Sequence, residues 1–340
     1  MPLLDARSPQ ALADAAAHLA AGELLAFPTE TVYGLGARAD DDAAVARIFD
    51  AKGRPRAHPL IVHVADPAAA RAFAASWPDA AQRLAAAFWP GPLTLIVPRR
   101  EGVASAAAGG AATIGLRVPG HPVAAALLRA AAQRGVPGVA APSANRFGRV
   151  STTCAAHVQQ EFGEQLWVLD GGDCPGGIES AIVDCTRAQP ALLRPGLLGR
   201  AQLEAVLAVP LAEAGADAPR ASGTLAAHYA PQARLRLMDA AQLKAALEVL
   251  RAAAAAGSPL RLAVYSRTPL PAAAGVQQRR MPAQAAAAAH ELFAVLRGFD
   301  AQRMQLIWVE TPPDEPAWDG VADRLRRAAA GSAAQEQEER

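Results

Sequence analysis

The chain has 340 residues, of which 52% are hydrophobic, and its 33 Lys and Arg residues balance 32 Asp and Glu residues to a formal net charge of +1. Because single cores stop growing at about 250–300 residues, this length predicts two domains. Non-specific nucleic-acid binding depends on many phosphate contacts, so a nearly neutral chain is not expected to bind nucleic acid stably.

Three cysteines, Cys154, Cys174 and Cys185, show no paired spacing of the kind that binds zinc. Reduced thiols in a cytoplasmic protein are the simplest interpretation. The N-terminus has no cationic stretch followed by an apolar core, and no uncharged apolar run reaches about 18 residues. We therefore expect a cytoplasmic protein that does not contact a membrane.

Residues 22–64 contain the segment around which the rest of the chain is organised. A strand-like run over residues 23–27 ends at Pro28, and a hydroxyl-rich, glycine-containing loop follows, of a composition suited to close approach to a ligand. A helix is predicted from Asp42, closed by the basic segment 52–55, and residues 60–64 alternate as a strand with His63 as a single polar side chain. Each piece alone has an ordinary explanation as a turn, a solvated helix end or a packed histidine. All three in one strand–helix–strand unit favour a ligand site.

The remainder of residues 1–209 alternates strands and helices without strict regularity, which predicts one mixed, twisted sheet with helices against it. The glycine- and alanine-rich segment 101–112 is predicted to be a mobile loop, either a cover over a site or an ordinary exposed connection. Besides the elements above, we expect helices at 9–20, from 67, from 79, and at 122–133, 153–162 and 199–207, and strands at 93–97, 113–118, 138–141, 166–170, 181–184 and 191–194.

Proline and glycine mark residues 210–233 as a linker. Residues 234–330 then form a βαβαβα pattern, which predicts a small parallel, Rossmann-like domain. The segment has no G-x-G-x-x-G motif, so no nucleotide is assigned to it. Its strands are expected at 234–238, 260–266 and 305–310, and its helices up to about residue 256, at 282–297 and at 317–330. The polar segment 331–340 is expected to be a disordered tail.

Seven segments resemble, in order, the motifs of the YrdC-domain family: PTETVYGLG, KGRP with PLIVHV, WPGPLTLIV, GLRVP, APSANRFG, GGIESAIVD and LLRPG. The resemblance covers about residues 8–208, and SGTLAAHYAP at 222–231 resembles the linker of the two-domain form. It implies the YrdC-type α/β fold, a twisted mixed sheet with an open concave face, followed by the small Rossmann-like parallel α/β domain.

The family's enzymes are L-threonylcarbamoyladenylate synthases, nucleotidyltransferases that begin the threonylcarbamoyl modification of tRNA. The resemblance implies that L-threonine, bicarbonate and ATP are joined into threonylcarbamoyl-AMP with release of pyrophosphate, and that downstream tRNA threonylcarbamoyl-transfer proteins are partners. No catalytic nucleophile is required, since positioning and stabilisation of charge would suffice. No metal cage is recognisable in the sequence, so Mg²⁺ would arrive with the triphosphate of ATP.

Matching the family's motifs residue by residue implies two sets of contacts. The implied threonine contacts are Thr31, His63, Arg117 and Ser180. The implied ATP contacts are Lys52, Arg54, His58, Ser143, Asn145, Ser151, Arg194 and Tyr229.

Three positions qualify this match. His58 stands where the family usually has a short polar residue, and Ala181 stands where the motif commonly has threonine, which alters either a substrate contact or only the packing of the strand. Tyr229 either folds over the nucleotide or packs as a linker aromatic between domains.

Two rival functions stay open at the level of sequence. The first is a module that binds RNA without catalysis, against which the near-neutral charge argues. The second is carbamoyl transfer from carbamoyl phosphate, as in hydrogenase maturation proteins with a related domain. Those proteins carry zinc-finger cysteine pairs, which this chain lacks.

Overall fold

The structure is a computed structural model that describes residues 3–215, 217–253 and 261–338. It divides into two compact units, Met1–Phe147 with Ser151–Thr224, and Gly148–Val150 with Leu225–Arg340. The predicted linker therefore does not form a separate segment. Residues 210–224 group with the first unit and residues 225–233 with the second, so the predicted domain limits at 209 and 234 need correction.

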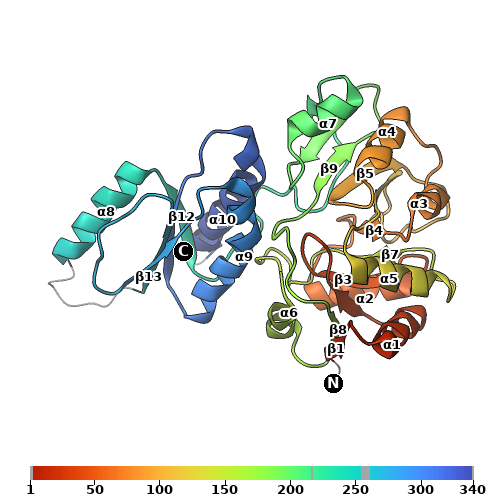
Figure 1. Ribbon diagram of the computed structural model, residues 1–340, viewed down its shortest axis with the longest axis horizontal. Coiled ribbons are helices and arrows are strands. Elements are labelled where there is room, and N and C mark those ends of the chain that lie inside the picture. The colour runs from red at the N-terminus through yellow and green to blue at the C-terminus, as the bar shows by residue number, and fades with distance from the viewer. Residues whose placement is uncertain (1–2, 216, 254–260, 339–340) are drawn as a thin grey trace. The chain divides into compact units, whose positions relative to one another are not determined.

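The first unit is built on one mixed sheet (Figure 1), whose described strands pair in the order β1-β8-β2-β3-β7-β4-β6-β5-β9-β10-β11. Pairs such as β4 with β6 are parallel, whereas β5 with β6 is antiparallel, as a mixed sheet requires. The strands are β1 (Leu3–Asp5), β2 (Leu25–Phe27), β3 (Gly34–Arg38), β4 (Ile61–His63), β5 (Leu93–Pro98), β6 (Thr113–Arg117), β7 (Val139–Ala140), β8 (Trp167–Asp170), β9 (Ala181–Asp184), β10 (Ala191–Arg194) and β11 (Ala212–Glu213).

Several helices of this unit begin at polar caps that the sequence provides. Asp41 accepts hydrogen bonds from the backbone N–H groups of residues 43 and 44, and Asp66 accepts one from residue 69. The helices are α1 (Pro9–Ala20), α2 (Asp42–Lys52), α3 (Pro67–Phe73), α4 (Asp79–Phe88), α5 (Pro122–Ala132), α6 (Ala155–Phe162) and α7 (Arg200–Leu207).

One face of the sheet is covered by the main hydrophobic cluster. Alternate strand residues such as Val62, Leu95 and Leu116 belong to it, together with side chains of α2, α3, α4 and α7. Since successive strand residues point to opposite faces, their neighbours lie on the second face. That face is covered by α1 and α5 only toward β8, β2 and β7.

The rest of the second face carries a small apolar cluster beside polar side chains. The apolar members include Ile61, Ile96 and Ile182. By strand alternation, His63 and Arg117 project from this same face. The face that the helices leave open is thus the one on which the candidate substrate residues lie.

A β-bulge determines where the side chain of Arg194, another cationic candidate residue, is placed. The register of β10 against β9 shifts between Leu192 and Arg194, so that Arg194 becomes the partner of Ile182. A bulge redirects a side chain across the sheet. It places Arg194 opposite a residue of the open face.

One loop prediction in the first unit is wrong. Gly34 and Gly36 belong to β3, and a Cβ on Gly36 would lie 2.8 Å from both Phe27 Cε1 and Val139 Cγ1. The glycine is therefore required by tight packing rather than by approach to a ligand. Segment 101–112 is a loop, as predicted, and part of it is packed: Ala107 is fully buried in the main cluster, and its carbonyl accepts a hydrogen bond of 2.7 Å from Leu60 N–H.

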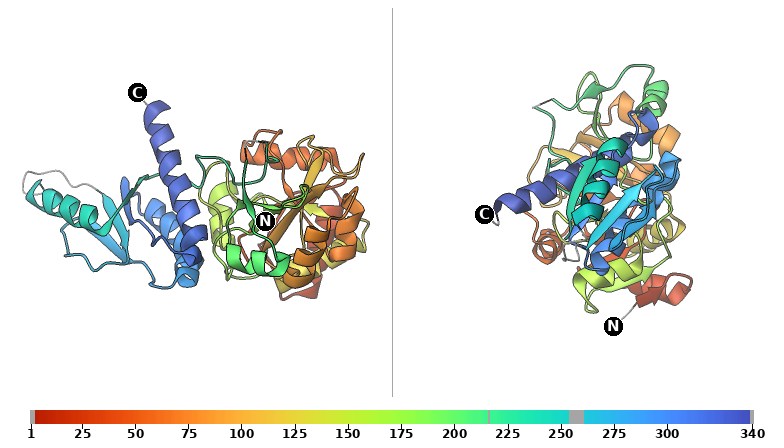
Figure 2. Two further views of the ribbon diagram at one scale, coloured as in Figure 1. Left: turned by 90° about the horizontal axis from the view of Figure 1, so that it is seen from above. Right: turned by 90° about the vertical axis from the view of Figure 1, so that its left-hand side faces the viewer.

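The second unit is a parallel α/β domain, as expected (Figures 1 and 2), with described strands in the order β12-β15-β13-β14. Helix α8 packs on one face through Leu243 and Leu247, which meet Leu262, Val264 and Trp308, and α9 and α10 lie on the other face. The elements are β12 (Arg234–Met238), α8 (Ala240–Ala253), β13 (Leu262–Ser266), β14 (Val276–Arg280), α9 (Ala285–Ala301), β15 (Leu306–Glu310), η2 (Pro316–Trp318) and α10 (Asp319–Glu338).

The C-terminal segment differs from its predicted state. Helix α10 continues to Glu338, so the prediction of a disordered tail from Gly331 is wrong for residues 331–338. A Cβ on Gly331 would lie 2.8 Å from the Cβ of Ala230, which shows that the helix is packed at this point. Residues 339 and 340, and the predicted helical residues 254–256, lie outside the described residues. In the described part of the chain, no helix combines the length and apolarity needed to cross a membrane.

Candidate active site

A histidine and an arginine occupy paired positions on neighbouring strands at the open face. His63 of β4 and Arg117 of β6 are partners in the parallel register, and the two residues are 3% and 4% exposed. Burial, followed by the charge of Arg117, lowers the pKa of His63 to about 3. His63 is therefore a neutral imidazole at physiological pH, and Arg117 supplies the positive charge.

Glu30 holds Arg117 from the adjacent loop. Its Oε1 lies 2.7 Å from Arg117 Nη2, and the arginine Nε donates a hydrogen bond of 3.3 Å to Gly91 O. Burial acts to raise the pKa of Glu30, but the charge of Arg117 and the nearby N–H groups outweigh it, so the pKa lies below its ordinary value. The pair therefore places one buried negative and one buried positive charge side by side.

The loop that carries Glu30 is held by its threonines and by the glycine segment. Thr29 Oγ1 donates a hydrogen bond of 2.7 Å to Val32 O and lies 2.8 Å from Thr31 Oγ1. Gly176 N–H and Gly177 N–H donate to the carbonyls of Glu30 and Thr31 at 2.9 and 3.1 Å. The backbone of this loop is thereby fixed, and its side chains have defined positions.

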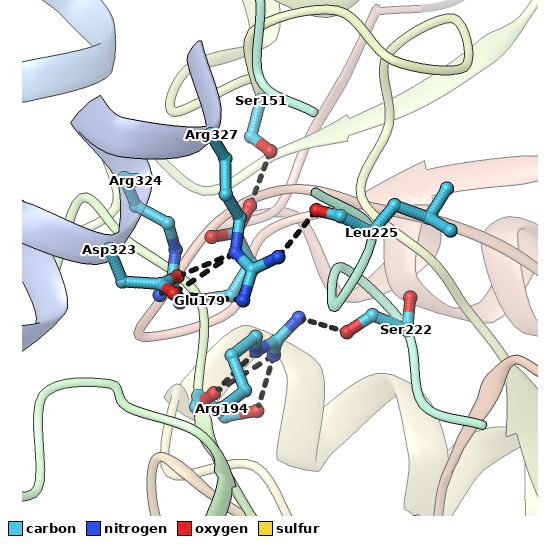
Figure 3. Close-up of polar contacts among 9 residues, drawn as sticks. Ser151, Glu179, Arg194, Ser222, Leu225, Asp323, Arg324 and Arg327 are labelled. Atoms are coloured by element: carbon cyan, nitrogen blue, oxygen red, sulfur yellow. Dashed lines mark hydrogen bonds and ion pairs between the residues drawn. The ribbon is translucent and has the colours of Figure 1, made fainter. Parts of the chain in front are cut away.

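Ser180, one of the threonine candidates, contacts both Thr94 and Arg194. Ser180 Oγ lies 2.8 Å from Thr94 Oγ1 of β5, and Ser180 O accepts hydrogen bonds from Arg194 Nε and Nη2 at 3.1 and 2.9 Å. Arg194 Nη1 donates to Ser222 O at 2.8 Å (Figure 3). A buried hydroxyl pair and a buried guanidinium are thus joined in one network.

Lys52 fastens the loop that contains Ser143 and Asn145. Its Nζ donates to Ser143 O at 2.6 Å and also to Asn145 O. Burial and the charge of Arg54 lower the pKa of Lys52 well below its ordinary value. Among the described residues, the Lys52 amine therefore holds the loop in place through hydrogen bonds to the carbonyls of Ser143 and Asn145.

Arg54 and His58 lie over one aromatic ring. The Cζ of Arg54 is 5.6 Å from the centroid of Phe147, and the ring centroid of His58 is also 5.6 Å away. Arg54 Nη2 further donates to Pro59 O at 3.0 Å and approaches Ser222 Oγ at 3.5 Å. The structure thus brings Arg54 and Arg194 together at Ser222, with His58 beside the ring of Phe147 that Arg54 also contacts.

Ser151 and Tyr229 differ in their placement. Ser151 belongs to the first unit and donates a hydrogen bond to the buried carboxylate of Glu179 (Figure 3). Tyr229 belongs to the second unit, where its ring stacks on Phe293 at 5.6 Å and lies under Arg324. The other candidates all lie in the first unit, and the predicted ATP contact of Tyr229 stays a prediction.

A cleft lies next to this network on the open face. It is a shallow, half-open cleft lined by polar residues such as Thr94 and Ser222 and by apolar residues such as Ile96 and Ile182. Gly115 also lines it, and a Cβ at this position would lie 3.4 Å from Thr94 Cγ2. An apolar wall with a few convergent polar groups is the usual form of a small-molecule site.

Ala181 stands where the family's motif commonly has threonine, and its surroundings explain the alanine. Ala181 is fully buried, belongs to the main hydrophobic cluster and pairs with Leu93 at the start of β9. Its methyl group fits an apolar contact on the far face of the sheet, which supports the packing interpretation of this substitution.

Four residues of this network escaped the sequence analysis: Glu30, Thr94, Glu179 and Ser222. Thr94 could have been identified from the sequence, because it is the single polar residue in the apolar strand LTLIV. His63 stands out in the same way as the single polar residue in LIVHV. Glu30 gave no such signal, since its partner Arg117 is distant in sequence.

The described residues contain no cluster of three or more His, Cys, Asp or Glu side chains suited to a metal. None of the three cysteines forms a disulfide, and burial raises the pKa of Cys174 and of Cys185. Neither thiol has the lowered pKa of a nucleophile.

Comparison with known proteins agrees with this geometry. A family model described as "Telomere recombination" (Sua5, YciO and YrdC) matches residues 17–196, and a model for the C-terminal domain of threonylcarbamoyl-AMP synthase matches residues 198–330. The threonylcarbamoyl-AMP synthase of Bacillus subtilis is 36% identical over 334 residues, which are 96% of this chain and 95% of the relative. That of Pyrococcus abyssi is 42% identical over 231 residues, which are 66% of this chain and 67% of the relative.

A solved structure shows the same two-domain fold. The crystal structure of P. abyssi Sua5 complexed with L-threonine matches with a TM-score of 0.86 and 34% identity, covering 96% of each chain. The mixed α/β fold with a twisted sheet and a smaller parallel domain is thereby confirmed. The chain belongs to the threonylcarbamoyl-AMP synthase family.

Proposed function

We propose that this chain joins L-threonine, bicarbonate and ATP into threonylcarbamoyl-AMP and pyrophosphate. The observation that carries the proposal is the buried Arg117, placed beside neutral His63 on the open face of a family-typical sheet. Two further arginines, Arg54 and Arg194, converge on Ser222 at the same unit's cleft. The site thus has separate cations for a carboxylate and for phosphates.

The first half of the reaction uses the amino acid pocket. The amine of threonine attacks the carbon of bicarbonate, and water leaves to give the carbamate. The fork of Arg117 suits the threonine carboxylate, because guanidinium binds carboxylate in bidentate fashion. Hydroxyl groups of Thr31 and Ser180, and the imidazole of His63, supply polar partners for the threonine hydroxyl, without which valine would be poorly rejected.

The second half is nucleotidyl transfer. A carbamate oxygen attacks the α-phosphorus of ATP, its bond to the bridging oxygen breaks, and pyrophosphate leaves with the electron pair. Arg54 and Arg194 would stabilise the phosphate charge, and Lys52 would keep Ser143 and Asn145 in place to contact the nucleotide. No covalent bond to the protein is needed.

Mg²⁺ is proposed as the companion of the triphosphate. The described residues offer no acidic cage for it, and Mg²⁺ commonly keeps several waters while binding substrate phosphates. It would neutralise charge on the leaving pyrophosphate. We also propose that the product passes to tRNA threonylcarbamoyl-transfer proteins, and that the protein works in the cytoplasm, where the thiols of its three cysteines would stay reduced.

The test supplies ATP, L-threonine and bicarbonate, omits each in turn, and follows pyrophosphate together with the mass of the adenylate. Pyrophosphate release that requires all three substrates is expected, with a product of the mass of threonylcarbamoyl-AMP. Pyrophosphate release that is independent of threonine, or salt-sensitive RNA binding without turnover, would contradict the proposal. Product formation only with carbamoyl phosphate would indicate carbamoyl transfer instead.

A further inference from the structure

The most unusual polar feature of the first unit is a group of buried atoms without aligned hydrogen-bond partners. Glu30 Oε1, Glu30 Oε2, Arg117 Nη2 and His63 Nδ1 all belong to this group among the described residues. Glu30 Oε1 and Arg117 Nη2 are 2.7 Å apart, so they attract each other as charges without the alignment of a hydrogen bond. Buried polar atoms are nearly always paired, and an unpaired set gathered at one point indicates a ligand.

The group has both signs of charge. His63 and Arg117 are register partners, Arg117 contacts Glu30, and the Glu30 side chain is only 14% exposed. His121 is buried as well, and its burial lowers its pKa while the negative charge of nearby Glu30 acts to raise it. An α-amino acid carries a positive amino group and a negative carboxylate on one carbon atom, so its charges are complementary to this arrangement.

We propose that Glu30 binds the amino group of the amino acid whose carboxylate is held by Arg117. The inference rests on the proposed function, and it adds a residue that recognises the reacting nitrogen. Glu30 would accept hydrogen bonds from this amino group and orient its nitrogen for attack on bicarbonate. The Glu30–Arg117 pair would thereby select ligands that carry both an α-amino and an α-carboxyl group.

A merely structural role for Glu30 makes a different prediction. If Glu30 only positions Arg117, its substitution weakens every ligand that carries a carboxylate to the same extent. If Glu30 contacts the amino group, its substitution weakens only ligands that have one. The two roles are separated by comparing L-threonine with the analogue in which a hydroxyl group replaces the α-amino group.

The experiment measures binding of both ligands by calorimetry, in buffer free of ATP and bicarbonate, to the full-length protein and to Glu30→Gln. The unchanged protein is expected to prefer L-threonine by about tenfold or more, the usual effect of a charge-assisted hydrogen bond. Glu30→Gln should lose most of this preference while binding the hydroxyl analogue about as well as before. Glu30→Asp, which keeps the charge, should recover part of the preference.

Glu23→Gln is the matched control, because Glu23 is 48% exposed and pairs with Arg47 at 2.6 Å outside this group. It should leave both affinities unchanged. ATP binding to Glu30→Gln, measured in parallel, checks that the variant is folded. If Glu30→Gln does not bind ATP, Glu30→Asp replaces it in the comparison. Its shorter side chain should also reduce the preference for L-threonine below that of the unchanged protein.

Equal losses of affinity for both ligands in Glu30→Gln, or no preference in the unchanged protein, would overturn the inference. Its failure is distinguishable from failure of the proposed function. A protein that shows the Glu30-dependent preference but forms no adenylate would contradict the proposed reaction alone. A protein that forms the adenylate while Glu30→Gln keeps its preference would contradict only the role of Glu30.

Discussion

His63 and Arg117 are partners on adjacent parallel strands, so a neutral imidazole is buried next to a guanidinium on the open face of the sheet. Neither side chain belongs to the main hydrophobic cluster, which covers the other face of the sheet. This pair has consequences for stability as well as for binding.

The depressed pKa of His63 predicts a pH-dependent stability. With a folded pKa of about 3 and an unfolded value of 6.5, the unfolded state binds more protons between these values. The free energy of unfolding should therefore fall as pH drops from about 6.5 toward 3, with the stabilisation fully present above 6.5. Hydrogen exchange of β4 and β6 at pH 7.5 and 5 measures this for the first unit alone.

His63→Gln should show a smaller fall in protection between the two pH values. His290→Gln replaces an exposed histidine of α9 and serves as the control. An identical pH dependence in His63→Gln and the unchanged protein would mean that His63 does not titrate in this way.

Arg117→Ala should reduce the rate of threonine-dependent pyrophosphate release by at least about a hundredfold, while ATP still binds. The change removes the proposed carboxylate ligand and leaves Glu30 as a buried charge without its partner. Arg117→Lys keeps the charge but not the fork, and should restore stability better than activity. Unchanged pyrophosphate release in Arg117→Ala would refute the assigned role.

Ser180→Ala should reduce the discrimination between threonine and valine by about ten- to a hundredfold, since a hydroxyl partner worth about 1.5–3 kcal/mol is removed. The measurement is kcat/KM for each amino acid. Thr94→Val tests the neighbouring hydroxyl, which lies 2.8 Å from that of Ser180. Ser105→Ala, at an exposed position, is the control. If the ratio for Ser180→Ala equals that of the control, Ser180 does not contact the threonine hydroxyl.

Lys52→Met should lower the free energy of unfolding by about 1–3 kcal/mol, because the carbonyls of Ser143 and Asn145 lose their shared donor. The loosened loop should also raise the KM for ATP more than the KM for threonine. Denaturant titration and initial-rate kinetics check both effects. Lys244→Met, at an exposed site of α8, should change neither. Equal increases in both KM values would indicate general disruption of the unit.

Gly196→Ala should destabilise the first unit by at least about 2–3 kcal/mol. A Cβ there would lie 2.2 Å from Ala181 N and 2.6 Å from Ser180 C, so the backbone around Ser180 would have to move. Gly298→Ala is the matched control: it lies inside α9, a Cβ would meet nothing within 4 Å, and helix propensity predicts a gain of about 0.5–1 kcal/mol. Thermal unfolding compares the two; equal midpoints would show that the contact at Gly196 is relieved without cost.

The apolar strands of the first unit were predictable because each is a short run of Val, Leu and Ile with turn residues at its ends, as at residues 93–97. Strand β3 was not, since its two glycines have the composition of a loop, and only their packing against Phe27, Val139 and Ala141 explains them. The family's motifs indicated Arg117 and Arg194, but no local pattern reveals the bulge that turns Arg194 toward the open face. Nor could the sequence link Glu30 to Arg117, because this ion pair joins a loop to a strand that is distant in sequence.

The tripeptide Gly148–Val150 belongs to the second unit although the chain on both sides of it belongs to the first. Gly148 O accepts a hydrogen bond of 2.8 Å from Ala230 N–H, and Val150 O accepts one from Arg297. The C-terminal segment from Leu225 onward is therefore not an appendage that can be cut away without effect. A chain ended after Thr224 would leave both carbonyls without these donors, a few residues from Asn145 and next to Ser151, so truncation should impair nucleotide binding even though every nucleotide candidate except Tyr229 is retained.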